Sequence, residues 1–186
     1  MAGAVRRLLK DGHGYTALPI QRIADEAGIA RSTFYLYFPD KTALLMRITE
    51  SATESLFTAA EAWLEHGFAD MAALERTILD VIAQRREHAD LLAALTEVSG
   101  YDEQVAAFWR ARVGGFIDLL QGRIEEGQRA GTIVPALDAA TTAAWTAWGV
   151  ERLLAQHVAT HPPREDQRLA AGLAGAIWST LGRPIG

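Results

Sequence analysis

Apolar residues recur at spacings of three and four along almost the whole chain. This spacing places them on one face of an α-helix, whereas the alternation expected of a half-buried strand is not visible. We therefore predict an all-α protein of about nine helices. The predicted helices cover residues 4–11, 20–27, 31–38, 39–66, 71–86, 91–98, 103–130, 139–159 and 165–181.

The stretch from Pro19 to Lys41 predicts two short helices joined by a tight turn. Gly28 ends the first helix, because glycine enters the left-handed backbone region without strain, and Pro39 ends the second. Two short helices that meet through such a turn form a helix-turn-helix, whose second helix can enter the major groove of DNA. A helical hairpin with a small aromatic core fits the same pattern.

The second of these helices carries side chains suited to DNA. Arg31 can donate two hydrogen bonds to a guanine edge, and Thr33 can contact a thymine methyl group or a phosphate. Phe34 and Phe38 lie four residues apart and are expected to face inward. Tyrosine and lysine side chains suit phosphate contacts, which position a protein without reading the base sequence. The predicted DNA-binding residues are Arg31, Ser32, Thr33, Tyr35, Tyr37 and Lys41.

The string T-F-Y-x-Y-F-P-D-K, which follows A-x-x-A-G-I, closely resembles the signature of the TetR family of one-component transcription regulators. The resemblance covers residues 5–47 with specific motifs and, more loosely, the whole length and helix layout. The F-Y-x-Y-F-P run and the later V-E-R run, at residues 150–152, are most similar to the EthR-like branch. The resemblance implies a helix-turn-helix DNA-binding domain over residues 1–47 and a helical ligand-binding and dimerisation domain over residues 48–186. One departure is Ala30, where the family usually has a serine that caps the recognition helix. Alanine forfeits a capping bond of about 1 kcal/mol and a hydroxyl that could contact a phosphate.

The composition of the chain indicates the cellular compartment of the protein. The 186 residues include no cysteine, which fits a reducing cytoplasm, and no apolar run reaches the roughly 18 residues of a membrane span. We predict a cytoplasmic protein with no membrane partner. The N-terminus lacks the long apolar region of a signal peptide. Because the family's first helix is usually longer and follows a basic arm, either the native start lies upstream of Met1 or the arm is absent.

Charge is distributed unevenly along the chain. The net charge is −5, but residues 1–48 carry seven basic and four acidic side chains, whereas the remainder carries eleven and nineteen. A positive N-terminal part on a negative body is expected when only one end meets phosphates.

The last two predicted helices are rich in small residues, which allow helix axes to approach closely. This pattern fits close packing inside one subunit as well as an interface between subunits. The resemblance implies a homodimer formed through these two helices. The residues are Ala139, Ala140, Ala143, Ala144 and Ala147, then Ala170, Ala171, Gly172, Ala174, Gly175 and Ala176.

Large aromatic residues cluster in the C-terminal part, at Trp109, Phe116, Trp145, Trp148 and Trp178. They fit either a packed core or a cavity for an apolar ligand. The resemblance to the EthR-like branch implies an effector tunnel lined by Trp109, Val113, Phe116, Ala147, Val150, Glu151, Leu154 and Trp178. Two of these, Ala147 and Val150, stand where that branch has polar amides, which indicates an effector that is more apolar or of a different kind. Glu151, beside Arg152, is either a pocket acid or part of a surface ion pair.

These features predict a ligand-responsive regulator, a repressor by family resemblance, that binds palindromic operator DNA and is released by a small apolar effector. No cofactor is predicted. The chain has no glycine-rich phosphate loop, nucleophile motif or acid pair, so an enzyme is not predicted. His157 and His161 lie four apart and could bind a metal, but His161 precedes two prolines and a third ligand is not evident. The alternative function is a helical enzyme or ligand-carrier dimer that does not bind DNA.

Overall fold

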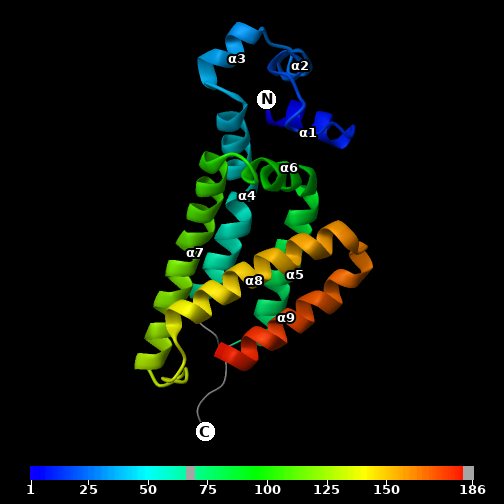
Figure 1. The fold of residues 1–186 in the computed structure, drawn as a ribbon. Helices are drawn as coiled ribbons and strands as arrows, with labels where there is room; N and C mark the ends of the chain where they lie inside the picture. The colour runs from blue at the N-terminus through cyan, green and yellow to red at the C-terminus, as the bar shows by residue number, and fades with distance from the viewer. Residues whose placement is uncertain (66–69, 182–186) are drawn as a thin grey trace. The chain divides into compact units, whose positions relative to one another are not determined.

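The computed structural model describes residues 1–65 and 70–181 (Figure 1). Within these two ranges the chain forms nine α-helices and one short 3-10 helix, with no strand. The all-α prediction is confirmed. No helix in the same ranges combines the length and the apolar character that crossing a membrane requires.

The helix boundaries follow the sequence pattern closely. Every predicted end that falls in the described ranges lies within two residues of the observed one. The predicted end of the long helix at His66, and the break at Gly67, lie outside the described residues. The helices are α1 (Ala2–Lys10), α2 (Ile20–Glu26), α3 (Arg31–Tyr37), α4 (Lys41–Glu65), α5 (Met71–Glu87), α6 (Ala89–Ser99), α7 (Glu103–Arg129), α8 (Ala139–Thr160) and α9 (Asp166–Leu181), with the 3-10 helix at Pro163–Glu165.

Aspartate side chains cap four of these helices. The Oδ1 atom of Asp138 accepts a hydrogen bond from the Thr141 N–H at 2.8 Å, and Asp70 and Asp102 bond the first turns of α5 and α7 in the same way. The fourth, Asp40, accepts from the Ala43 N–H at 2.7 Å. Because Asp40 is the capping residue, α4 begins at Lys41 and not at Pro39.

The chain packs as two compact units. One comprises residues 1–54 and 88–110, and the other comprises residues 55–87 and 111–186, of which 66–69 and 182–186 lie outside the described residues. The core of the first unit combines residues of α1 to α4 with residues of α6, such as Leu91 and Leu95. The predicted functional boundary between residues 47 and 48 stays a prediction. The packing adds α6 and the start of α7 to the N-terminal helices, because α6 covers apolar positions that these helices leave open.

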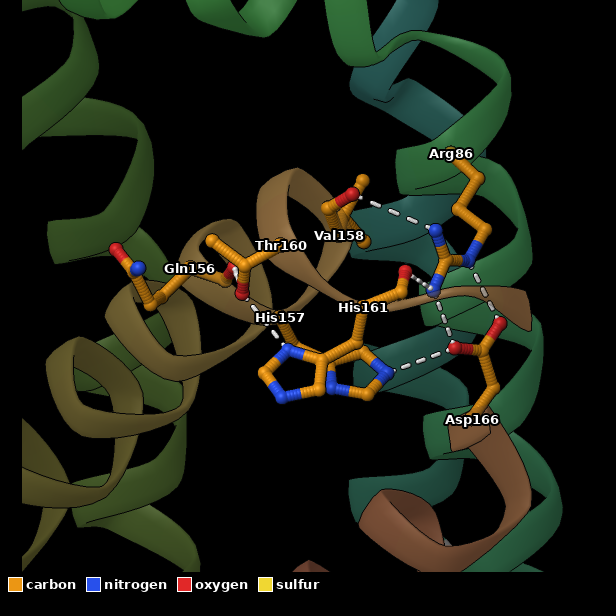
Figure 2. A network of polar contacts seen from close by, with 7 residues as sticks. All are labelled: Arg86, Gln156, His157, Val158, Thr160, His161 and Asp166. Carbon is orange, nitrogen blue, oxygen red and sulfur yellow. Dashed lines mark hydrogen bonds and ion pairs between the residues drawn. The ribbon is translucent and has the colours of Figure 1, made fainter. Parts of the chain in front are cut away.

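In the second unit, α5 packs against both α8 and α9. These last two helices follow one another as a hairpin with the 3-10 helix at the bend (Figure 1). A polar network joins the three helices (Figure 2). The guanidinium of Arg86 on α5 binds Asp166 at the start of α9 through Nε at 2.7 Å and Nη2 at 2.6 Å. Asp166 Oδ1 also lies 2.8 Å from His157 Nε2 on α8. The Arg86 guanidinium, with His157 as a second contributor, holds the pKa of Asp166 below its ordinary value.

Candidate nucleic-acid interface

The turn between α2 and α3 is built on Gly28. Its φ of 68° lies in the left-handed region, which a residue with a Cβ enters only with strain. The Ile29 N–H bonds the Ala24 carbonyl at 3.0 Å, and the Gly28 N–H bonds the Asp25 carbonyl at 3.1 Å. This pair of bonds is the Schellman arrangement that ends a helix at glycine. The chain can therefore turn sharply into α3.

Phe34 anchors α3 from behind. Its side chain is fully buried in the core of the first unit, and Phe38 is half-buried against the same core. The two rings lie 5.7 Å apart. As predicted, this face of α3 points inward, so the remaining side chains of the helix are directed away from the core.

The outward face of α3 carries most of the predicted DNA-binding residues. Arg31, Ser32, Tyr35 and Tyr37 are exposed, and Thr33 is half-buried. Arg31 leans over the Tyr35 ring, with its guanidinium carbon 5.7 Å from the ring centroid and its Nη2 atom 3.3 Å from the hydroxyl. Their roles on DNA stay predictions, but the structure presents them on one exposed helix.

Sequence reasoning missed Leu36. It is the most exposed large apolar residue in the described part of the chain, at 80%. Leu36 lies two residues after Phe34, so it is turned about 200° from the buried side of the helix. That spacing from Phe34 was the signal that could have identified it. An exposed leucine here can contact the methyl group of thymine.

Ala30 is the N-cap residue of α3 and makes no side-chain capping bond. Its carbonyl still accepts the first bonds of the helix, from Thr33 at 2.9 Å and Phe34 at 3.2 Å. The helix therefore forms without the serine cap that the family usually has, as expected if buried Phe34 supplies its stability.

Lys41 occupies a different environment from the other five residues. Its ammonium donates to the backbone carbonyls of Tyr15, Thr16 and Leu18 at 3.1, 2.7 and 3.0 Å. A lysine ammonium has three N–H donors, so these bonds use all of them. Burial lowers the pKa of Lys41, and the nearby Glu97 carboxylate acts in the opposite sense.

The eight predicted effector residues are divided between the two units. Trp109 packs against the core of the first unit, and the other seven belong to the second. Val113, Ala147 and Leu154 are buried there, and Phe116 and Val150 pack beside its core. Trp178 is half-buried. Whether the eight line one cavity stays a prediction.

Glu151 forms an ion pair, but not with its neighbour Arg152. Its Oε1 atom accepts from Arg85 Nη2 on α5 at 3.0 Å, and the Arg85 side chain is only 8% exposed. Burial lowers the pKa of Arg85, which Glu151 partly offsets. The partner is therefore a buried arginine on another helix and not a residue at the surface.

Two of the clustered tryptophans do not lie in a packed core. Trp145 is 64% exposed and Trp148 is 37% exposed on α8, so the packed-core interpretation is wrong for these two residues. Helical spacing shows which residues share a face, but it does not show whether the same chain covers that face.

A cleft of about 470 Å³ lies between α8 and α9, lined by residues that include Leu153, Leu173 and Ala176. None of the eight predicted effector residues lines it. His157 and His161 stand at its end with their rings stacked 4.9 Å apart. Within the described ranges, no group of three or more His, Asp or Glu side chains is arranged to hold a metal ion.

Known proteins are similar in sequence to the part of the chain that contains α2 and α3. Residues 5–48 match the family model "Bacterial regulatory proteins, tetR family". The chain is 28% identical over 144 residues to the HTH-type transcriptional regulator EthR of Mycolicibacterium smegmatis, across 75% of this chain and 66% of that protein. The alignment thus spans slightly less than two thirds of this relative.

Solved structures extend the likeness to the whole chain at the level of the fold. The TetR family transcriptional regulator PfmR of Thermus thermophilus aligns with a TM-score of 0.66 at 19% identity, covering 98% of each chain. The transcriptional regulator FadR of Bacillus subtilis, in complex with stearoyl-CoA, aligns with a TM-score of 0.71 at 17% identity, covering 92% of this chain and 95% of that one. The helix-turn-helix geometry and the match of residues 5–48 to the family model identify the N-terminal part of the chain as a DNA-binding domain of the TetR family, and the solved structures show that the whole chain has a fold similar to that of TetR-family regulators.

Proposed function

We propose that this protein is a repressor that binds palindromic operator DNA as a homodimer and leaves it when a small apolar effector binds. The observation that carries the proposal is the two-sided character of α3. Phe34 is fully buried behind the helix, whereas Tyr35, Leu36 and Tyr37 are 46%, 80% and 73% exposed in front of it. A short helix held in this way can enter a major groove without rearrangement.

On this proposal, Arg31 reads a base edge, Leu36 and Thr33 contact thymine methyl groups, and Tyr35, Tyr37 and Ser32 contact phosphates. Lys41 is left out of the direct contacts, because its three donors already bind backbone carbonyls. The positive charge of residues 1–48 supplies the long-range attraction to the duplex.

Dimerisation follows from the size of one recognition helix. A single seven-residue helix reads too few bases for a specific site, whereas a twofold dimer places two such helices about 34 Å apart on successive turns of the duplex. The outer surface of α8 and α9 suits a second copy, because it exposes Trp145 and Leu153. At Gly149, Gly172 and Gly175, an added Cβ would meet no atom within 4 Å. The protomer's own packing therefore does not require glycine there.

The effector proposal rests on the apolar character of the second unit around Val113, Ala147 and Leu154. FadR, whose fold is similar, is described with a bound stearoyl-CoA, which favours an effector with a long apolar part. Because α4 contributes residues to both units, a ligand that displaces α4 in the second unit can change the separation of the two recognition helices. The ligand must bind the DNA-free conformation more tightly than the DNA-binding conformation, because a ligand with equal affinity for both does not change their populations.

The test is a selection of bound duplexes from a random-sequence library, followed by titration of the selected duplex. The Arg31→Ala and Tyr37→Ala proteins are expected to bind it weakly, with Arg31→Ala losing about 1–3 kcal/mol per half-site. Arg110→Ala, which removes an exposed arginine from α7, is the matched control. If the wild-type protein retards no duplex, the chain is instead a ligand carrier or another helical dimer.

The switch is tested by repeating the titration with compounds that raise the melting temperature of the protein. We expect such a compound to weaken binding to the selected duplex. Equal affinities with and without it would discard the switch and leave DNA binding intact.

A further inference from the structure

The loop that leads into α2 is held from one side by Lys41. The Lys41 ammonium binds three carbonyls of residues 15–18, at 2.7 to 3.1 Å. The Tyr15 hydroxyl returns a bond to the Lys41 carbonyl at 2.7 Å, and its ring lies 5.5 Å from the ammonium nitrogen. Tyr15 is almost fully buried. The start of α4 and this loop are therefore joined by four hydrogen bonds.

Helix α6 and the turn after it hold the same loop from the other side. The Thr16 hydroxyl bonds the Glu97 carboxylate and lies 2.7 Å from the Tyr101 hydroxyl. In the same turn, Asp102 accepts a hydrogen bond from the Thr42 hydroxyl at 3.0 Å. The loop is thus bonded to residues that lie far away in the sequence, on α4 and on the α6–α7 segment.

The position of this loop sets the position of the recognition helix. Leu18 is followed directly by Pro19, the N-cap residue of α2, and α2 leads through the Gly28 turn into α3. Because these bonds use all three N–H donors of the Lys41 ammonium, none remains for a DNA phosphate. Their effect is to fix where α2 begins relative to α4, and therefore how α3 is presented.

We propose that Lys41 is a positioning residue for DNA binding and not a phosphate contact, and that it acts with Glu97 and Tyr101 by holding residues 15–18. This inference rests on the proposed DNA-binding function. Helix α6 follows α5 after a single residue, and α5 belongs to the other unit. The chain therefore connects α5 directly to α6, the helix that carries Glu97.

The geometry of the ammonium allows an experiment to distinguish a positioning role of Lys41 from a phosphate contact. Three carbonyls converge on one nitrogen, which suits a compact ammonium with three rotatable donors. A guanidinium keeps the charge but directs its donors in a planar fork. Arginine at position 41 would therefore preserve an electrostatic contact with phosphate while losing the convergent bonds to the loop.

The experiment compares Lys41→Arg, Lys41→Met and Thr16→Val with the wild-type protein on two duplexes. One is recovered by selection from a random-sequence library, and the other is an unrelated duplex of equal length. Binding is measured between 50 and 200 mM salt, roughly the range over which phosphate contacts dominate the change in affinity. Lys10→Met, which removes an exposed lysine at the end of α1, controls for the loss of one charge.

We expect all three variants to bind the selected duplex about tenfold or more weakly than wild type. The slope of log affinity against log salt concentration should be the same in each variant as in the wild-type protein. Affinity for the unrelated duplex should fall no further than it does in the Lys10→Met control. Hydrogen exchange in residues 15–26 should be faster in Lys41→Arg than in Lys10→Met. A protein that is merely unfolded in part would lose affinity for both duplexes equally, and that outcome overturns the proposal.

The phosphate alternative predicts a different pattern. Lys41→Arg would bind like wild type, and Lys41→Met would reduce the salt slope by about 0.9 for each phosphate that the protein no longer neutralises. Either result overturns the proposal. If the Lys41→Met protein does not fold, Lys41→Arg and Thr16→Val decide the question. If the wild-type protein selects no duplex, the proposed function fails, and unchanged exchange in Lys41→Arg would separately refute the role of Lys41 in holding the loop.

Discussion

At the residue scale, the candidate interface depends on single positions whose conformation or contacts other residue types cannot reproduce. Gly28 is one, because its φ of 68° permits the turn between α2 and α3. Lys41 is another, because its small ammonium fits between three carbonyls. Phe34 is a third, since its ring is fully buried while the residues that follow it are exposed. Gly28 sets the direction in which the chain enters α3, and Phe34 anchors one face of the helix so that the other face is exposed. On our proposal, Lys41 holds the loop that leads into α2.

The Gly28→Ala substitution tests the turn. An added Cβ at Gly28 meets no atom within 4 Å, so the cost comes from the backbone conformation alone. We expect the free energy of unfolding to fall by about 1 kcal/mol, the penalty for a residue with a Cβ in the left-handed region. Urea denaturation at constant protein concentration measures it.

The matched control is Gly114→Ala, inside α7, where an added Cβ also meets no atom. Alanine is a better helix former than glycine, so this change should raise the free energy of unfolding by up to about 1 kcal/mol. If both substitutions changed stability in the same direction, left-handed strain would not explain the effect of Gly28→Ala.

At the scale of elements, the second unit is joined by charged contacts as well as by its apolar core. Consecutive arginines on α5 bind different helices, Arg85 pairing with Glu151 on α8 and Arg86 with Asp166 on α9. Arg86 Nη2 also donates to the His161 carbonyl at 2.9 Å, at the end of α8. The end of α5 thus fixes both helices of the C-terminal hairpin, whose outer surface is the proposed dimer interface.

The Asp166→Asn substitution tests this connection through its pH dependence. The pKa of Asp166 is lowered in the folded protein, so the carboxylate stabilises the fold fully above its unfolded pKa of about 3.9. That stabilisation is lost as the pH falls through the lower folded pKa. The wild-type protein should therefore be more stable than Asp166→Asn at pH 6, and the difference should shrink below about pH 4.

Urea denaturation between pH 2.5 and 6 measures the difference, at a fixed protein concentration because dimerisation would contribute to stability. Asp80→Asn removes one exposed carboxylate from α5 and controls for the change in net charge. A difference for Asp166→Asn that stays constant across this pH range would show that the network does not depend on the ionised carboxylate.

At the scale of the whole molecule, the proposed repressor needs two copies. The protomer exposes Trp145 and Leu153 on α8, and Leu153 lines a cleft of about 470 Å³ between α8 and α9. Large exposed apolar residues around a concave surface indicate a protein partner. On our proposal the partner is a second copy of the chain, because a twofold dimer would cover this surface and would also supply the second recognition helix.

The Gly172→Leu substitution tests the interface. Gly172 lines the cleft, and an added Cβ there meets no atom of the protomer, so leucine should leave the helical content unchanged. In the dimer it should prevent the close approach of the two copies. We expect light scattering to show a monomer for Gly172→Leu, and the affinity for a palindromic duplex to fall by at least tenfold.

Gly115→Leu on α7 is the control, because Gly115 is exposed and equally open but lies on another helix. It should remain dimeric. A Gly172→Leu protein that stays dimeric at micromolar concentration would place the interface elsewhere on the molecule.

Much of this arrangement could be predicted from local sequence. Apolar spacing located the helices, and Gly28 fixed the turn between α2 and α3. The carboxylates of Asp70, Asp102 and Asp138 marked three helix starts. All of these signals act over a few residues, where backbone geometry leaves few alternatives. The inward Phe34 followed in the same way from its spacing to Phe38.

Only the tertiary structure decided which partners meet across the chain. The bonds from Lys41 to residues 15–18, the pair of Arg85 with Glu151 and the pair of Arg86 with Asp166 join segments that are 23 to 80 residues apart. Local periodicity carries no information about such pairs. It also could not show that Trp145 faces outward, because an apolar helix face has the same pattern whether its own chain or a second copy covers it. The sequence by itself determined the helices and the helix-turn-helix, and the packing of distant segments determined which side chains hold the recognition helix and which remain exposed.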